Sequence, residues 1–453
     1  MEQPPPTPYL YPYMNLPLYL ARGVARSGTK SVSRTIIMIA VAAVAISMAT
    51  MVVASALITG FKSEISDKIF GFWGHIHITA DAASYGIFDT YNYPISNQQD
   101  FYPTLDTTGQ ITMQAFGNSL GRQTAEPERS LGGIRHIQQF IVLPGVVSVY
   151  PEGERLPTQE ALVLKGIGED YDWPSFGKYL VEGEPLLVES DSVNRGIVIS
   201  KITADRLGLE LGDRMDFAFI GENMQERPRV FEVTGIYKTG LEEFDRQFAL
   251  VDLRHPRALL GWKDDEIGGF EVVLDNIGDM DLFNDYIHYN VLPQDLYADS
   301  IRTKMSELFS WLDIQDYNLA IILILMIVVA IINMMTALLI LILERTNMIG
   351  TLKALGQSSW SIRKIFLYYA GFIILSGLVL GNGIGLLLCW LQETFELVRL
   401  DEESYYLSVA PVQVDWLEVA LLNVGTFGVT LLFLVVPSYL VTRVDPVKAI
   451  RFK

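Results

Sequence analysis

Four long stretches of the chain contain no Asp, Glu, Lys or Arg, and they constrain the fold more than any other feature. They cover residues 35–61, 317–343, 365–392 and 419–442. Each is longer than the ~20 apolar residues that a helix needs to cross the hydrocarbon core of a bilayer. Half of the chain is hydrophobic although it carries 52 acidic residues, so apolar and charged residues must be separated along it. We therefore predict an α-helical membrane protein with four transmembrane helices at these positions.

The first stretch has to be distinguished from a cleaved signal peptide, because basic residues precede it and Ala54-Ser55-Ala56 resembles a cleavage site. Its 27 uncharged residues far exceed the ~7–15 of a signal-peptide core, so we expect a retained helix.

The N-terminal lead, residues 1–34, is rich in proline at its start. From Asn15 onward, apolar and basic residues each recur every four positions, which is typical of an amphipathic helix on the inner membrane surface. A plain charged flank is the alternative.

Basic residues beside the stretches predict the orientation, because cytoplasmic flanks retain positive charge. Segments 1–34, 344–364 and 443–453 share this property, and their basic residues are Arg22, Arg26, Lys30, Arg34, Arg345, Lys353, Arg363, Lys364, Arg443, Lys448, Arg451 and Lys453. The 393–418 loop instead holds seven acidic residues and one arginine. We therefore predict a multi-pass inner-membrane protein with both termini in the cytoplasm. Because no stretch contains a charged residue, an ion-coupled transporter or channel is disfavoured.

The 62–316 segment is placed in the periplasm by this orientation. It holds 42 acidic and 21 basic residues, a net charge of −21, which excludes nucleic acid as a partner. The single cysteine, Cys389, lies inside the third stretch, so an apolar core must stabilise the segment without an intrachain disulfide.

Short runs rich in β-branched and aromatic residues alternate with helical patterns in this segment, which predicts an α+β domain in two lobes. The expected strands are His75–Thr79, Ala161–Lys165, Ile197–Ser200, Met215–Ile220, Val230–Ile236, Phe248–Leu253 and Phe270–Leu274. The expected helices are Lys201–Leu207, closed by Gly208, Asp279–Val291 and Ser300–Leu312. The polar stretch 85–157 predicts loops and insertions around one or two helices.

The cytoplasmic segment LERTNMIGTLKALGQSSWSIRKIF, residues 343–366, carries the most functional information. Met348, Leu352 and Leu355 share one face of a short helix, with Ile349 beside them, and Gly356 is a natural C-terminal stop. Ser358 or Ser359 is suited to cap the next helix. A short amphipathic helix between two spans suits the transmission of force from a soluble partner, although a simple interfacial re-entry helix has the same pattern.

This segment resembles the coupling-helix region of the lipoprotein-releasing (Lol) ABC permeases, within the wider group of macrolide-exporter and FtsX-type permeases. The resemblance extends, in order, to GFWGHIHIT after the first span, KGIGEDYDWPSFGKYLVEG at 165–183, FEVTGIYKTGLEEFD at 231–245 and VDPVKAIRF at 444–452. It implies an ATPase dimer that docks on the coupling helices, and a periplasmic domain that uses this motion to extract a lipoprotein from the outer leaflet. By match to the family motif, the ATPase contacts are Thr346, Met348, Ile349, Gly350, Leu352, Lys353 and Gly356.

A lipoprotein substrate requires an apolar lateral opening near the outer leaflet, because each CH₂ kept out of water gains about 0.8 kcal/mol. The outer halves of the first two spans can line such an opening, and ordinary lipid-facing or helix-packing surface is the alternative. The candidate acyl contacts are Met51, Ala54, Leu57, Ile58, Phe61, Leu319, Ile322, Leu323 and Met326.

No phosphate-binding GxxxxGK[ST] loop occurs in the chain, so ATP and magnesium are expected on a separate ATPase subunit. His75 and His77 alternate on one strand but lack the spacing of a metal or catalytic motif. We therefore expect a non-catalytic permease without a cofactor of its own. Its other partners are a second permease copy or a related permease, membrane lipid and, as in some family members, a periplasmic lipoprotein chaperone.

Two related tasks keep the same fold: export of a small toxin or peptide, and regulation of a cell-wall hydrolase. The chain is longer than the cell-division permeases of the second kind. A signalling receptor is disfavoured because the cytoplasmic segments are too short for an output domain.

Overall fold

A computed structural model describes residues 32–83, 88–113, 127–150, 157–189, 192–220, 226–401, 405 and 407–443. The chain divides into two compact units. The helical unit comprises Met1–Lys62, Asp313–Val398 and Ala410–Lys453, and the sheet unit comprises Ser63–Leu312 and Arg399–Val409. The predicted amphipathic lead before residue 32 and the VDPVKAIRF motif lie outside the described residues.

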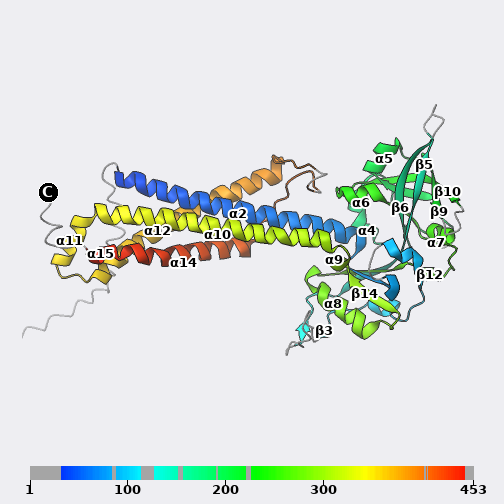
Figure 1. Cartoon of the computed structure of the whole chain (residues 1–453), viewed down its shortest axis with the longest axis horizontal. Coiled ribbons are helices and arrows are strands. Elements are labelled where there is room, and N and C mark those ends of the chain that lie inside the picture. Colours follow the sequence, from blue (N-terminus) through cyan, green and yellow to red (C-terminus); the bar gives the residue numbers. More distant parts are fainter. Residues whose placement is uncertain are drawn as a thin grey trace, which may run out of the picture. The chain divides into compact units, whose positions relative to one another are not determined.

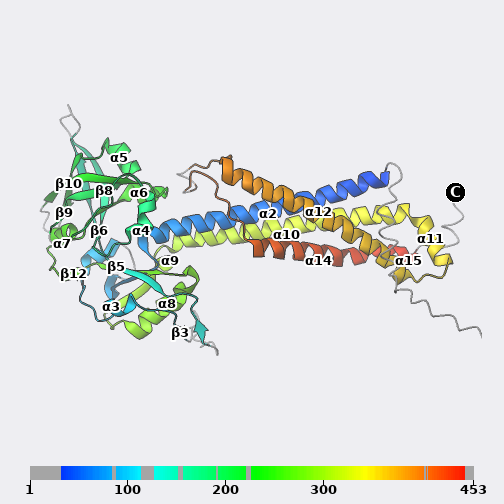
Figure 2. The ribbon, with the colours of Figure 1, turned by 180° about the vertical axis from the view of Figure 1, so that it is seen from behind.

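The helical unit contains four helices long and apolar enough to cross a membrane, counted among the described residues. They lie side by side in Figures 1 and 2. The bounds are α2 (Val32–Trp73), α10 (Ser306–Glu344), α12 (Ser359–Phe395) and α14 (Trp416–Ser438), with the short helices α11 (Thr346–Ala354) and α15 (Leu440–Arg443) at their ends. Each of the four predicted stretches thus falls within a longer helical segment. α2 continues without interruption from the helical unit into the sheet unit.

Helix α12 packs closely on α2 through glycines that recur every four residues. A Cβ added to Gly381 would lie 2.6 Å from the Ala45 carbonyl oxygen, and one added to Gly377 would lie 2.7 Å from the Val44 Cβ. Gly385 continues the series. Small residues let helix backbones approach in a membrane, where lipid removes the hydrophobic driving force between helices.

Helices α12 and α14 are joined by a pair of amides. The Asn382 side chain donates to Asn423 Oδ1 at 2.7 Å, and Asn423 donates back to Asn382 Oδ1 at 3.1 Å. Asn382 lies in the third apolar stretch and Asn423 in the fourth. In an apolar environment a polar side chain is costly unless it finds a partner, and here each amide satisfies the other.

The sheet unit is built on a ten-stranded mixed sheet, in the order β14-β1-β13-β5-β6-β11-β8-β10-β7, with β9 pairing both β10 and β5. One sheet therefore runs through the region for which we predicted two lobes. Its strands are β1 (Ile76–Ala80), β5 (Ile134–Val149), β6 (Thr158–Ile167), β7 (Leu180–Gly183), β8 (Gly196–Ser200), β9 (Arg214–Ile220), β10 (Glu226–Tyr237), β11 (Phe248–Asp252), β13 (Gly269–Leu274) and β14 (Leu296–Ser300). Two small ladders pair β2 (Ile95–Ser96) with β12 (Glu266–Ile267) and β3 (Thr112–Met113) with β4 (Glu128–Arg129).

Short helices surround this sheet. They are α3 (Tyr102–Leu105), α4 (Trp173–Phe176), α5 (Lys201–Leu207), α6 (Glu242–Gln247), α7 (Arg254–Leu260), α8 (Met280–Tyr286) and α9 (Ile301–Lys304), with 3₁₀ turns η1 (Asp81–Ala83), η2 (Phe88–Asn92), η3 (Gly177–Tyr179) and η4 (Ile277–Asp279), and the π-helical turn η5 (Ile287–Val291). α5 has the predicted bounds, because Ser200 caps its start and Gly208 ends it at φ +66°. All seven predicted strands are present within a few residues of their expected bounds.

Strand β5 was missed by the sequence prediction, which read residues 85–157 as loops and helices. It is 16 residues long and pairs with β6, β9 and β13. Polar residues at its start and Pro144-Gly145 in its middle break the local strand pattern. The Cβ-free Gly145 is required here, because an added Cβ would lie 2.2 Å from the Phe217 ring of β9. Residues 134–149 therefore form a strand because they pair with strands distant in the sequence, and no local pattern reveals this pairing.

Candidate functional site

Helix α11 follows α10 directly and has one buried and one exposed face. Ile349 and Gly350 are buried, and Met348 and Leu352 pack against the same apolar core of the helical unit. The Thr346 hydroxyl donates to the Leu343 carbonyl at 2.6 Å, which fixes the turn between the helices. Four of the seven predicted ATPase contacts therefore point into or toward the chain's own core.

The end of α11 is a Schellman motif. Gly356 has φ +86°, its N–H donates to the Lys353 carbonyl, and the Gln357 N–H donates to the Leu352 carbonyl, both at 3.0 Å. Gly356 therefore has a backbone role as the predicted stop. The helix ends before Leu355, so Leu355 does not pack beside Met348 and Leu352 as expected but remains 77% exposed. The exposed face comprises Asn347, Thr351, Ala354 and Leu355.

Cationic side chains fasten α11 and the start of α12 to the end of α14. Lys353 Nζ donates to the Thr442 carbonyl of α15 at 3.1 Å. Arg363, in the first turns of α12, lies 4.1 Å from the ring centre of Tyr439 and donates to Ser438 Oγ at 3.4 Å. A cation near a helix C-terminus is favoured by the helix dipole. Lys353, predicted to contact the ATPase, is thus engaged within the chain. Ser358 is the α12 cap, accepting from the Ser361 N–H.

The candidate acyl contacts lie on partly covered helix surfaces. Met51 is fully buried in the core of the helical unit. The other eight are half-buried, and Leu323 and Met326 pack against that core. The Lys62 ammonium of α2 lies 2.5 Å from the Asp316 carboxylate of α10 and joins the two helices just beyond their apolar stretches. The outward face of α10 is formed by other residues, namely Tyr317, Ile321, Ile324, Leu325, Val328 and Ile332.

The loop after α12 covers one face of the outer half of α2. The Gln413 N–H donates to the Ala56 carbonyl at 3.0 Å, and a Cβ on Gly60 would lie 2.8 Å from the Gln413 nitrogen. Gln392 holds the base of the loop by donating to the carbonyls of Val398 and Ala410. Access to the outer half of α2 is therefore limited to its remaining faces, which carry Leu57 and Ile58.

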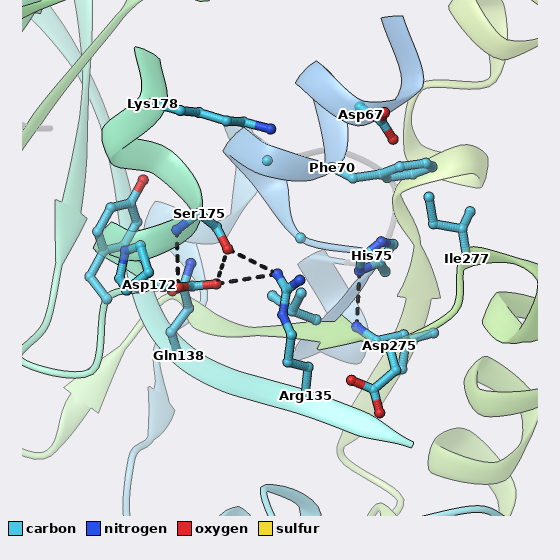
Figure 3. Close-up of a pocket in the computed structure, with 16 residues that line it drawn as sticks. Asp67, Phe70, His75, Arg135, Gln138, Asp172, Ser175, Lys178, Asp275 and Ile277 are labelled. Atoms are coloured by element: carbon cyan, nitrogen blue, oxygen red, sulfur yellow. Dashed lines mark hydrogen bonds and ion pairs between the residues drawn. The ribbon is translucent and has the colours of Figure 1, made fainter. Parts of the chain in front are cut away.

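The sheet unit has a polar cavity of about 320 Å³ beside the last turns of α2, lined by residues of α2, β5, α4 and the end of β13. Figure 3 shows Arg135 reaching Asp172 and Ser175, at 3.3 Å and 3.0 Å, with Lys178 on the opposite wall. Ser175 donates to Asp172 rather than to a histidine. The charged residues that line the cavity include both signs, and the hydrogen bonds of Arg135 join β5 to the start of α4.

His75 and His77 have structural roles. His75 Nδ1 accepts the Leu274 N–H at 3.0 Å, and burial, followed by the Arg135 charge, lowers the pKa of His75 to about 4. His77 bonds the Trp73 carbonyl at 2.7 Å through Nε2, and burial lowers its pKa well below the usual value. Among the described residues there is no group of three or more His, Cys, Asp or Glu that is suited to a metal ion.

The sequence reasoning missed a buried ion pair in the sheet unit. Lys165 of β6 and Glu271 of β13 are fully buried, with the ammonium 2.7 Å from Glu271 Oε1. The sequence indicated this pair only by placing a charged residue inside each of two apolar strand runs. Because the two residues are 106 positions apart, nothing local in the sequence showed that they pair.

Comparisons with known proteins cover nearly the whole chain. A model of the MacB-like periplasmic core domain matches residues 37–288, and a model of the FtsX-like permease C-terminal segment matches residues 320–446. Relatives named lipoprotein-releasing system transmembrane protein LolC, from Xylella fastidiosa and Neisseria meningitidis, are each 22% identical, covering 92% of this chain and 94% of the relative. LolE of Haemophilus influenzae is 21% identical, covering 96% and 99%. The crystal structure of the extracellular domain of the noncanonical ABC-type transporter YknZ, from Gram-positive bacteria, matches 50% of this chain and 99% of its own at 12% identity, with a TM-score of 0.28.

Four apolar helices, an α+β unit between the first two, and a short amphipathic helix between the second and third define a membrane permease. The core-domain model spans more than half of the chain, so the chain belongs to the family of permeases with a MacB-like periplasmic core and is a permease of the Lol type. The resemblance identified from the sequence is confirmed.

Proposed function

We propose that this permease extracts lipoproteins from the outer leaflet of the inner membrane for delivery to the outer membrane. ATP hydrolysis takes place on a partner ATPase, and the permease passes the resulting motion to its sheet unit in the periplasm. A second permease, identical or related, completes the membrane part. The names of the relatives, which match over almost their full length, support the cargo class.

The proposed orientation follows from charge. Twelve basic residues fall in segments 1–34, 344–364 and 443–453, which flank the apolar stretches, whereas the 393–418 loop holds seven acidic residues and one arginine. This charge pattern supports a cytoplasmic position for both termini and α11, and a periplasmic position for the sheet unit.

The observation that carries the ATPase part of the proposal is the two-sided packing of α11. Its buried face, with Ile349 and Gly350, fixes the helix to the bundle, and Lys353 fixes it to α15. The exposed face offers Thr351 and the apolar Leu355 to a soluble partner. We therefore assign docking to the exposed face and assign the buried predicted residues to transmission of the motion.

The acyl chains of the cargo are proposed to meet the half-buried residues of α2 and α10. Leu57, Ile58 and Phe61 on α2, with Leu319 and Ile322 on α10, fit this role better than Met51, which is already covered by the chain's own side chains.

Leu355→Asp tests the docking face. Because Leu355 is exposed, we expect the permease to fold normally but to capture its ATPase about tenfold more weakly, since an interface anchor is worth more than about 1 kcal/mol. The measurement is copurification of ATPase with the full chain in detergent. Leu355→Met keeps the apolar contact and serves as the matched control. Wild-type capture by the Asp variant would remove the assignment.

Depletion of the permease in its own organism tests the cargo. We expect lipoproteins destined for the outer membrane to accumulate in the inner membrane, as measured by membrane fractionation. Unchanged sorting would contradict the proposal and leave toxin or peptide export, or control of a wall hydrolase, as the task.

A further inference from the structure

The last turn of α2 ends against a buried ammonium group. Lys165 Nζ donates to the Phe72 carbonyl and lies 2.7 Å and 3.0 Å from the two carboxylate oxygens of Glu271. The rings of Phe72 and Trp73 surround it at 4.8 Å and 4.6 Å. All of these residues belong to the sheet unit.

The same cluster ties three neighbouring strands to the helix. Lys165 lies on β6 and Glu271 on β13, and Gln138 of β5 donates to Glu271 Oε2 at 2.7 Å. β5 is hydrogen-bonded to both β6 and β13. One ammonium therefore connects the end of α2 to the strands around β5.

Stability alone does not explain a charge at this position. Removing two ions from water is costly, and an apolar pair of similar volume often stabilises a core equally well. An apolar side chain, however, offers no hydrogen bond to a helix C-terminus, whose last carbonyls lack partners within the helix and favour a nearby cation. What the lysine adds over an apolar residue is its hydrogen bond to the Phe72 carbonyl, beside the Trp73 carbonyl that His77 bonds.

A polar cavity flanks the same end of the helix. Phe70, Gly71 and Gly74, from the end of α2 and the residue that follows it, line this 320 Å³ space (Figure 3), whereas Phe72 and Trp73 are fully buried. The Arg135–Asp172 pair across the cavity is partly exposed, and exposed pairs contribute little. That pair joins β5 to the start of α4, whereas the buried ammonium contacts α2 directly.

We infer that Lys165 is a positioning residue that fastens the end of α2 to the sheet, so that a displacement of α2 moves the strands with it. This rests on the proposed function, in which motion must reach the periplasmic unit. α2 contains no proline across its 42 residues, and a continuous helix is suited to carry the displacement.

The test uses full-length Lys165→Met/Glu271→Leu, which replaces the pair by apolar residues. We expect the variant to fold, because no buried charge is left unpaired, with a melting temperature lowered by the loss of partners for the Phe72 carbonyl and the Gln138 amide. In proteoliposomes with the ATPase, release of a fluorescent acylated lipoprotein should fall at least tenfold while ATP hydrolysis continues. Lys165→Arg, which keeps a donor for the carbonyl, is the matched control and should retain most of the release.

A second measurement does not depend on the cargo. Spin labels at Glu64→Cys on α2 and Glu232→Cys on β10, in a Cys389→Ala background, report the distance between the helix end and the sheet. We expect a narrow distribution with Lys165 and a broadened one in the double variant. If that variant does not fold, Lys165→Glu/Glu271→Lys keeps the ion pair but moves the ammonium, and should broaden the distribution equally.

A wild-type distance distribution, or wild-type release, in the apolar or the exchanged pair would overturn the inference. Failure of the unaltered protein to release any lipoprotein would instead contradict the proposed function and leave the distance measurement intact.

Discussion

Helix α2 is held by different chemistry in the two units through which it runs. In the helical unit, the glycines of α12 let two backbones approach closely, and the contact contains no charge. In the sheet unit, its last turn is bound by a buried ammonium and flanked by a polar cavity. The difference follows from the surroundings. Lipid gives no hydrophobic gain for helix association, so close fit must supply it, whereas a core formed in water is stable enough to enclose an ion pair.

The largest expected effect concerns the end of α2 that lies in the sheet unit, beside the polar cavity. His75 has a pKa of about 4 in the folded unit, below its usual 6.5, because of burial and Arg135. Because this pKa is depressed, the unfolded chain binds the proton at a higher pH than the folded unit does. The contribution of neutral His75 to folding stability is therefore fully present above pH 6.5 and is lost as the pH falls to about 4. The cost is about 3 kcal/mol, at 1.36 kcal/mol per pKa unit. The carboxyl groups of Asp67 and Asp275 line the same polar cavity as His75.

His75→Asn keeps an acceptor for the Leu274 N–H but does not titrate in this range. Hydrogen exchange of β1 and β13 amides in the full chain, compared between the two proteins at each pH, measures the effect. The wild-type protein should lose protection relative to the variant below pH 6.5. A difference in protection that is independent of pH would show that protonation of His75 does not control the stability of these strands.

A smaller effect is expected where α2 packs against the glycines of α12 in the helical unit. Gly381→Leu would force a side chain against the Ala45 backbone, and overpacking of this kind typically costs about 1–3 kcal/mol. Denaturation of the full chain in detergent measures the loss. Gly383→Leu is the control on the same helix, because an added Cβ there meets nothing within 4 Å. Equal stability of the two variants would mean that close backbone approach does not hold this end.

The candidate site was predictable to the extent that its signals are local. The pattern of residues 343–366 predicted the short helix, its glycine stop and a serine cap for α12. It did not reveal which face would be free. Ile349 and Gly350 are buried because α12 and α15 contact one side of α11, and α15 lies 89 residues further along the chain. Leu355 is exposed because the helix ends before it.

The sequence by itself determined the four apolar helices, α5 with its closing glycine, and the seven strands whose residues alternate or cluster over short windows. Length, charge and local backbone preference suffice for these. Tertiary structure alone decided that residues 134–149 form the central strand β5, and that Lys165 meets both Glu271 and the end of α2. These contacts join residues up to 140 positions apart, as between Ile134 and Leu274, and the free energy of such a contact depends on both partners, which no local window of sequence contains.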